Sequence, residues 1–388
     1  MLALILLEKC DTALDRQPME GHFAMRDRHR GFALLATVML IAALLILQAG
    51  CGNGMTTPDT LDDALKAPLP IDKIETWAYQ LQGLSEAGAV RELEESEYDM
   101  LVLEPTRTDW SSDDREFDTA SMVEDLKAST AEGGEHRKLV LAYLDIGEAE
   151  DWRWYWTWSR DWEPGEPFPP DWPDFILAPD PDGWEGNYPV AYWEPAWKDI
   201  IIYGENTGSH ADRDYRSALD EILRDGFDGV YLDWVEGYQY IPVALEALRQ
   251  DLDPAQEMVD LIQEIGEYAQ ERDPDFLVVQ QNAAALASEI PEVLDYIDAI
   301  AQEAIWYDGE AFDDWDDPDA ADIAVDPQLT MEYLRDLDDY MEAGLPVFDC
   351  EYAVEYAAEA YTRSRDQGFI PYCTRRALSR LTSTPPPD

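Results

Sequence analysis

Short apolar runs alternate with helical segments along most of this chain, and this order constrains its fold more than any other feature. Eight runs are candidate strands, at residues 76–81, 99–103, 139–146, 229–233, 276–281, 297–303, 346–350 and 369–373. Alternating strands and helices, with eight strands, favour a (β/α)8 barrel. A doubly wound open sheet is the alternative, although no glycine-rich phosphate loop follows the first run. The eighth run is the weakest, because Pro371 cannot donate a ladder hydrogen bond.

The fourth candidate strand ends in a candidate catalytic acid. A helical segment over residues 215–224 runs into Gly226, a residue type that ends helices, and the apolar run follows. Alternation places Tyr231 and Asp233 on one face of that strand. In a barrel this face is the interior, and enzymes of this fold keep their chemistry at the C-terminal ends of the strands. The alternative is that Asp233 is a structural acid at the start of an acidic loop.

A long aromatic insert separates the third and fourth candidate strands. It spans about 80 residues, far more than an ordinary connection. Nine of the 14 Trp lie in it, between Trp152 and Trp197. Indole rings stack on the apolar faces of sugars, and their N–H groups donate hydrogen bonds. We expect most of these side chains to form the insert's own core and two or three to face a ligand.

Carboxylates are so abundant here that only their position can mark a site. Those at the ends of candidate strands are Glu104, Asp145 with Glu148, Asp233, Glu303, and Asp349 with Glu351. Converging at one barrel mouth, they would suit glycoside hydrolysis, in which one carboxyl protonates the leaving oxygen and another acts as nucleophile or base. Serine-nucleophile chemistry is disfavoured, because the chain has no Gly-x-Ser-x-Gly sequence and only four His.

The composition is strongly acidic, with 84 Asp+Glu against 27 Lys+Arg and a formal net charge of −57. Nucleic-acid binding is excluded, because phosphate contacts need clustered Lys and Arg. Disorder is not indicated, since 46% of the residues are hydrophobic. We expect a high-salt environment, in which such a surface stays hydrated and its self-repulsion is screened. Attraction of a cationic substrate is a second, compatible explanation.

Residues 1–51 resemble a targeting segment. A basic cluster precedes an uncharged run over residues 31–51, as in a signal peptide. The run ends in Leu-Gln-Ala-Gly-Cys at Cys51, which resembles a bacterial lipobox, although Gln48 departs from its aliphatic preference. An uncleaved membrane anchor is the alternative, since the run is near the ~20-residue length of a span. Both interpretations place the rest of the chain outside the cytoplasm, and Met25 is then the expected natural start.

The remaining sequence divides into a tether over residues 52–70, one large domain over residues 71–380 and a tail over residues 381–388. Cys350 and Cys373 are expected to be buried free thiols, with pairing as the alternative. We expect no metal and no cofactor, because the His residues have no ligand spacing. The acidic run from position 313 is expected to be a solvated loop, with a calcium site as the alternative.

Six motifs occur in an order that resembles glycoside-hydrolase family 114 and its relatives. This group includes endo-α-1,4-polygalactosaminidases, spherulin-4-like proteins and extracellular glycosidases of bacteria and archaea. The motifs are residues 77–82, 98–103 and 141–150, the pair Tyr155 and Trp156, and residues 187–197 and 226–233. The resemblance covers about residues 74–380. The motifs are specific in combination, although each alone is weak.

The resemblance implies a TIM barrel with catalytic acids at the ends of the fourth and sixth strands, here Asp233 as nucleophile and Glu303 as general acid/base. Glu303 as a binding group is the alternative. Together with strand-end position, the resemblance indicates substrate-binding roles for Tyr79, Gln80, Asp145, Glu148, Tyr231, Trp234, Asn282 and Asp349. A helix beginning at Glu148 is the alternative for that acid. One departure is Glu104, because relatives often end the second strand with Asp.

We therefore expect a secreted, lipid-anchored, monomeric glycosidase on a (β/α)8 barrel. Its expected substrate is a polysaccharide cleaved internally, rich in galactosamine if the activity of the family carries over. Its expected contact with the membrane is the anchor at Cys51. The alternative is a non-catalytic carbohydrate-binding lipoprotein on the same barrel, which is favoured if Asp233 and Glu303 do not face the same cleft.

Overall fold

Eight parallel strands form one sheet in the order β1-β2-β3-β6-β7-β8-β11-β12. Their bounds are β1 (Trp77–Gln80), β2 (Met100–Leu103), β3 (Leu139–Asp145), β6 (Gly229–Asp233), β7 (Leu277–Gln281), β8 (Ala299–Glu303), β11 (Val347–Glu351) and β12 (Ile370–Cys373). All eight predicted strands are confirmed, each to within two residues at either end. With helices between the strands, the sheet forms a (β/α)8 barrel that is nearly closed.

The computed structural model of the chain describes residues 66–105, 117–131, 134–181, 183–206, 216–309, 315–317 and 320–382. The predicted anchor with Cys51 lies outside these residues, as do residues 52–65 of the predicted tether and 383–388 of the predicted tail. The described residues belong to one compact unit, Leu61–Asp388. Within them, no helix combines the length and the apolar character needed to cross a membrane.

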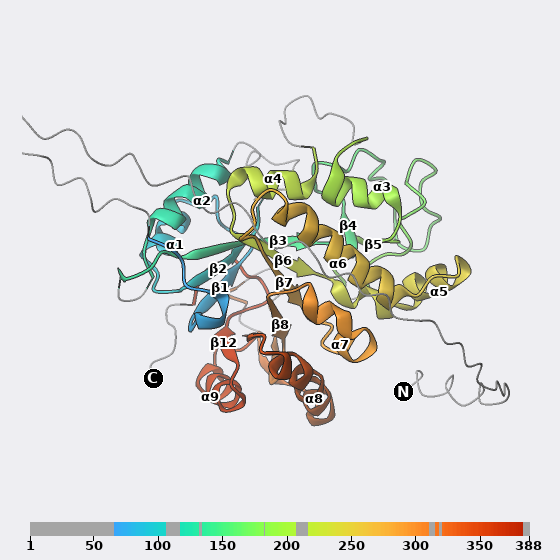
Figure 1. Cartoon of the computed structure of the whole chain (residues 1–388). Coiled ribbons are helices and arrows are strands. Elements are labelled where there is room, and N and C mark those ends of the chain that lie inside the picture. Colours follow the sequence, from blue (N-terminus) through green and yellow to red (C-terminus); the bar gives the residue numbers. More distant parts are fainter. Residues whose placement is uncertain are drawn as a thin grey trace, which may run out of the picture. The chain divides into compact units, whose positions relative to one another are not determined.

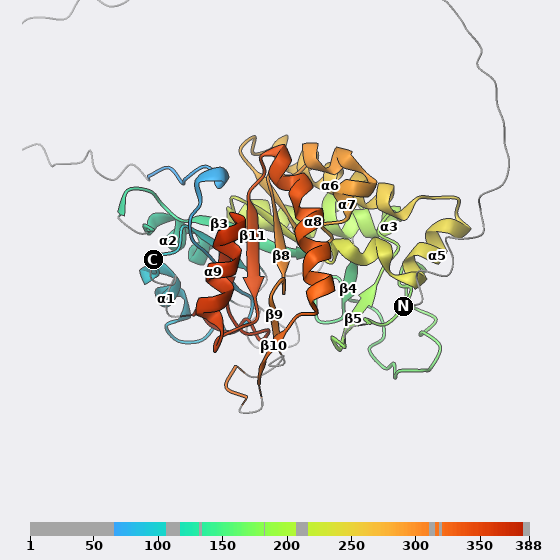
Figure 2. The same cartoon turned by 90° about the horizontal axis from the view of Figure 1, so that it is seen from below.

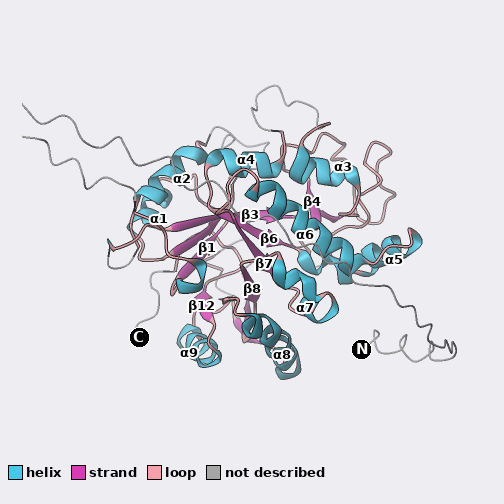
Figure 3. Ribbon diagram, in the orientation of Figure 1, coloured by secondary structure: helices cyan, strands magenta, loops and turns pink. Residues whose placement is uncertain are grey.

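Helices cover the outer side of the sheet, as Figures 1 and 3 show. They are α1 (Ala89–Glu95), α2 (Thr119–Ala128), α3 (Pro195–Lys198), α4 (Ala218–Asp225), α5 (Ile241–Arg249), α6 (Pro254–Gln270), α7 (Leu286–Glu289), α8 (Pro327–Ala343) and α9 (Ala357–Gln367). Helix α4 ends at Gly226 as predicted, with φ at 83° and the cap N–H bonded to the carbonyl of Ile222. A glycine adopts this left-handed conformation at little cost, so the chain can turn directly into β6.

Aspartates at the N-terminal side of the barrel fix how neighbouring strands pair. Asp228 lies just before β6, and its carboxyl accepts the backbone N–H of Val140 on β3 at 3.0 Å. Asp298 lies before β8 and accepts the N–H of Val278 on β7 at 2.8 Å. Each such contact satisfies a donor at the start of a strand and opposes a slip of the register.

Aromatic rings fill the interior of the barrel. The Trp77 ring lies 5.5 Å from Phe348, and the Tyr79 ring lies 5.0 Å from Tyr231. Tyr231 therefore faces inward, as alternation predicted, and Asp233 shares its face two residues later. These rings fill the centre of the barrel below the strand ends.

Pro371 is compatible with its strand because of where its nitrogen lies. The backbone N–H of Thr374 donates to the backbone carbonyl of Glu351 on β11 at 2.8 Å. Because backbone groups alternate between the two edges of a strand, the nitrogen of Pro371 lies at the opposite edge of β12. That edge faces β1, the other end of the sheet. The proline thus costs the β11–β12 ladder no hydrogen bond.

Two small antiparallel sheets lie beyond the C-terminal ends of the barrel strands. One pairs β4 (Glu148–Glu150) with β5 (Asn187–Pro189), and the other pairs β9 (Tyr307–Gly309) with β10 (Asp322–Ala324). Figure 2 shows β9 and β10 on the side to which the arrowheads of β8 and β11 point. These sheets build up the rim of the barrel mouth.

The tryptophan-rich insert has its own core, as expected. The Trp156 ring lies 5.1 Å from Trp172, which lies 4.7 Å from Tyr188 on β5. Five of its nine tryptophans are buried, namely Trp154, Trp156, Trp172, Trp193 and Trp197. Trp184 is the clearest exception, with 40% of its surface exposed. Most of the tryptophans that mark this insert in the sequence therefore pack in its core.

Candidate active site

The strand ends bring three of the predicted acids to one mouth. Asp145 ends β3, Asp233 ends β6 and Glu303 ends β8. Asp145 and Asp233 are direct register partners on neighbouring strands, so their side chains share a face. Asp233 and Glu303 are half-buried, whereas Asp145 is buried.

Asp233 accepts a hydrogen bond at each carboxyl oxygen. The hydroxyl of Tyr143 donates to Oδ2, and the backbone N–H of Trp234 donates to Oδ1 at 2.7 Å. Burial and the charge of Glu303 raise the pKa of Asp233 to about 7, while these two hydrogen bonds lower it. The charge of Glu303 thus reaches Asp233 at the mouth of the barrel.

Glu303 is held by residues that follow both neighbouring strands, β7 and β11. The hydroxyl of Tyr352, which follows β11, donates to Oε2 of Glu303 at 2.7 Å. The backbone N–H of Glu303 donates to Oδ1 of Asn282, just after β7, at 2.9 Å. Burial raises the pKa of Glu303, and the Tyr352 hydroxyl and the positive charge of Arg376 oppose this rise. These contacts hold the Glu303 carboxyl in place, and Arg376 partly compensates its negative charge.

A third carboxyl, Glu236, lies beside the first two. It belongs to the 3-10 helix η6 (Val235–Gln239), and its Oε1 accepts a hydrogen bond from Asn282 at 3.2 Å. Burial and the charge of Asp233 raise the pKa of Glu236 to about 8. Its Oε2 is buried with no partner in the described part of the chain. Asn282, predicted to line the sugar subsites, therefore links Glu236 to Glu303.

The predicted aromatic ligands of sugar are less open than expected. Tyr79 and Tyr231 lie within the barrel, each at most 2% exposed. Trp234 is 8% exposed, and its backbone is left-handed with φ at 58°. A Cβ on Gly147 or on Gly237 would lie within 2.7 Å of that ring. These glycines let the indole pack against the backbone beside Asp233.

Asp145 and Glu148 form the insert side of the mouth. Oδ1 of Asp145 accepts the backbone N–H groups of Gly147 and Glu148, at 3.0 and 2.8 Å. Glu148 begins β4, so the alternative of a helix there is wrong, and its Oε2 accepts from Asn187 at 3.2 Å. Burial raises the pKa of both carboxyls, that of Glu148 to about 12. Oδ2 of Asp145 is buried without a partner among the described residues, and the carboxyl of Asp180 lies beside that of Glu148.

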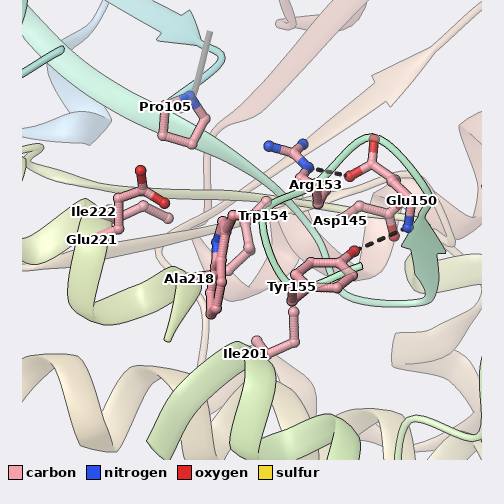
Figure 4. Close-up of a pocket in the computed structure, with 11 residues that line it drawn as sticks. Pro105, Asp145, Glu150, Arg153, Trp154, Tyr155, Ile201, Ala218, Glu221 and Ile222 are labelled. Atoms are coloured by element: carbon pink, nitrogen blue, oxygen red, sulfur yellow. Dashed lines mark hydrogen bonds and ion pairs between the residues drawn. The ribbon is translucent and has the colours of Figure 1, made fainter. Parts of the chain in front are cut away.

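A buried arginine lies behind Asp145. Arg153 donates to both oxygens of Glu104, at 2.6 and 2.9 Å. It also donates to Glu150 at 2.6 Å, a contact that Figure 4 shows. The adjoining cavity, lined in part by Asp145 and Trp154, measures about 20 Å³. It can hold one water molecule and no sugar. Glu104, the residue that departs from the family pattern, is therefore one partner of this ion-pair cluster.

Two predicted residues face away from the mouth. Gln80 donates its side-chain amide to the carbonyls of Gln82 and Ser379, at 3.1 and 3.2 Å. Asp349 points to helix α9, where the hydroxyl of Ser364 donates to it. Both strands place aromatic neighbours of these residues inside the barrel, so alternation directs Gln80 and Asp349 outward. The structure does not bring either side chain to the acids at the mouth.

The sequence analysis did not predict that Tyr143, Glu236, Tyr352 and Arg376 lie near these acids. Tyr143 had a usable signal, because it lies two residues before Asp145 and shares its face. The others lie in loops after β6, β11 and β12, and only the fold brings them to the acids.

No group of three or more His, Cys, Asp or Glu in the described ranges has the geometry to hold a metal ion. Residues 310–314 and 318–319 of the acidic loop lie outside those ranges. Cys350 and Cys373 are buried free thiols.

Sequence comparisons agree with this architecture. The model of Glycoside-hydrolase family GH114 matches residues 59–385. An uncharacterised protein of Deinococcus radiodurans is 28% identical over 364 residues, which cover 89% of this chain and 99% of that protein. An uncharacterised protein of Methanocaldococcus jannaschii is 30% identical over 321 residues, covering 79% of this chain and 78% of its own.

Two solved structures share the barrel. One is the glycoside hydrolase domain of PelA from Pseudomonas aeruginosa, and the other is Aspergillus fumigatus Ega3 in complex with galactosamine. Each is 16% identical to this chain, with a TM-score of 0.50. The alignments cover 79% of this chain and 97% and 94% of the two structures, respectively. At this identity they establish a common fold.

Proposed function

The chain belongs to glycoside-hydrolase family GH114, and we propose that it hydrolyses a galactosamine-rich polysaccharide with Asp233 and Glu303 as its catalytic carboxyls. One observation carries the choice of residues. Both carboxyls are half-buried at the ends of barrel strands, and the charge of Glu303 raises the pKa of Asp233. Two carboxyls that share one small, partly dry volume are what glycoside hydrolysis needs.

Hydrogen bonding favours Asp233 as the nucleophile. Both of its oxygens accept hydrogen bonds, from Tyr143 and Trp234, which favours the ionised form. Glu303 also accepts hydrogen bonds, from Tyr352 and Gln281, and the resemblance to the family assigns it the proton that the leaving oxygen takes. In this assignment Asp233 attacks the anomeric carbon and Glu303 protonates the leaving group, then activates the water. The predicted outcome is retention of configuration.

A cationic amino sugar suits the empty acceptors of the mouth. Oε2 of Glu236 and Oδ2 of Asp145 have no partner among the described residues, and each is close enough to Asp233 to share its electrostatics. An ammonium group has three N–H donors and would satisfy such oxygens. The complex of Ega3 with galactosamine supports the same sugar class for this chain.

The proposals on location and mode of action come from the sequence. We propose a secreted lipoprotein anchored at Cys51, because residues 31–51 have the order of a signal peptide and a lipobox. Internal cleavage of the polymer is proposed from the activity of endo-acting relatives. A net charge of −57 supports function in high salt.

The test is product release from de-N-acetylated and N-acetylated hexosamine polymers in high salt. The wild-type protein should release reducing ends from a galactosamine polymer. Asp233→Asn and Glu303→Gln should each lose at least about 10³-fold in kcat. Asp366→Asn, at an exposed position on α9, should behave as the wild type.

The alternative of a non-catalytic carbohydrate-binding protein makes a different prediction in the same assay. Binding of the polymer by all four proteins, with no release of reducing ends by any of them, would sink the enzymatic proposal. Release that survives in both carboxyl variants would instead overturn the choice of residues.

A further inference from the structure

A buried glutamate supports the loop that carries Glu303. Glu351 ends β11 and is fully buried. Its Oε1 accepts the backbone N–H of Ile305 at 2.8 Å, and its Oε2 accepts that of Tyr307 at 2.6 Å. The N–H of Trp306 lies between the two oxygens, at 3.0 and 3.2 Å. One carboxyl therefore satisfies three consecutive backbone donors that follow Glu303.

The neighbours of Glu351 hold the rest of the same segment. The carbonyl of Cys350 accepts the N–H of Ala304 at 2.8 Å, and the hydroxyl of Tyr352 donates to Glu303 at 2.7 Å. Three consecutive residues at the end of β11 thus contact Glu303 and the four residues after it.

The segment needs this support because its backbone is strained. Ala304 has φ at 50°, a left-handed conformation that is unfavourable for a residue with a Cβ. The three N–H groups beyond it point out of the sheet, where a buried donor without a partner is expensive. An acceptor with two oxygens in one plane satisfies all three.

We propose that Glu351 is a positioning residue, whose carboxyl fixes residues 304–307 and thereby the direction in which Glu303 presents its own carboxyl. The inference rests on the role of Glu303 in the proposed function. Glu351 itself faces outward from the barrel, on the opposite face from Cys350 and the interior rings, so it does not touch substrate.

The experiment compares Glu351→Gln with Asp298→Asn in the full chain. Glutamine keeps one acceptor oxygen and presents N–H groups to a backbone donor. Asp298 is a matched control, because its carboxyl accepts a backbone N–H of Val278 at the opposite end of the barrel, before β8. Steady-state kinetics on the galactosamine polymer and amide hydrogen exchange of residues 303–309 are measured for both variants and the wild type.

Glu351→Gln should lower kcat about 10- to 100-fold with KM within about twofold, because a small misplacement of a reacting group has this cost. Exchange of the Ile305, Trp306 and Tyr307 amides should accelerate. Asp298→Asn should lower Tm while kcat and these three amides stay as in the wild type.

Unchanged exchange of these amides, or faster exchange with wild-type kcat, would overturn the positioning role. If the wild-type protein is inactive on every polymer, the proposed function is refuted. The exchange rates of the Ile305, Trp306 and Tyr307 amides in Glu351→Gln then test whether Glu351 holds this segment. If Glu351→Gln is insoluble, Glu351→Asp keeps the carboxylate but withdraws it by one methylene from the three backbone N–H groups, and kcat should fall in that variant too. A wild-type kcat in that variant would also contradict the proposal.

Discussion

At the scale of single residues, the environment of Asp233 shows how the site sets a protonation state. Burial and the charge of Glu303 raise the pKa of Asp233 to about 7. The hydroxyl of Tyr143 opposes this by donating to the ionised form. The aspartate therefore changes charge near neutral pH, and the hydrogen bond from Tyr143 lowers the pH at which it does so.

Tyr143→Phe removes that hydroxyl and little else. The pKa of Asp233 should then rise further, so the acid limb of kcat/KM against pH should move up by about one pH unit. Activity should fall most below neutral pH and recover partly at higher pH. Tyr192→Phe is the control, since it removes a buried hydroxyl bonded to the carbonyl of Pro254 at 2.6 Å. An unshifted acid limb in Tyr143→Phe would contradict this account of Asp233.

At the scale of elements, the turn after β6 depends on close packing between two loops. The Trp234 indole lies against Gly147 of the loop after β3 and Gly237 of η6. Trp234 in turn donates its backbone N–H to Asp233. The loops after β3 and β6 therefore fix one another, and the position of Asp233 depends on both.

Gly147→Ala should disturb this contact. Its Cβ would lie 2.4 Å from the carbonyl oxygen of Trp234 and 2.7 Å from the ring, so one loop must move. We expect kcat/KM to fall at least about tenfold and stability to drop by about 1–3 kcal/mol in a urea titration. Gly266→Ala in α6 is the control, because its Cβ would have 3.5 Å to Val278. Equal activity of both variants would show that the loop contact does not matter.

At the scale of the whole molecule, charge dominates. A net charge of −57 on 388 residues repels itself, and among the described residues several acids have their charge compensated by arginine, as in the contacts of Arg153 with Glu104 and Glu150. Most other carboxylates face solvent, where salt shortens the range of their repulsion. Stability should therefore depend on ionic strength more than in an ordinary domain.

Thermal unfolding should show this dependence directly. Between about 0.1 M and about 1 M NaCl the screening length falls from about 10 Å to about 3 Å. Tm should rise by more than about 5 °C over this range, because the folded state concentrates the negative charge. Sucrose, which adds no screening, is the control. A flat Tm in NaCl would remove the reason to link this composition to high salt.

Local pattern alone determined the order of elements and the inward face of β6. Apolar runs of strand length, Gly226 after a helix and the two-residue period from Tyr231 to Asp233 are properties of neighbouring residues, so they survive without a tertiary context. The directions of Gln80 and Asp349 were decided only by the fold. Strands β1 and β11 are buried on both faces, so contact with solvent does not mark which of their faces lies inside the barrel. Tyr352, Arg376 and Glu236 reach the acids because parallel strands gather distant loops at one mouth, a proximity that no local spacing records.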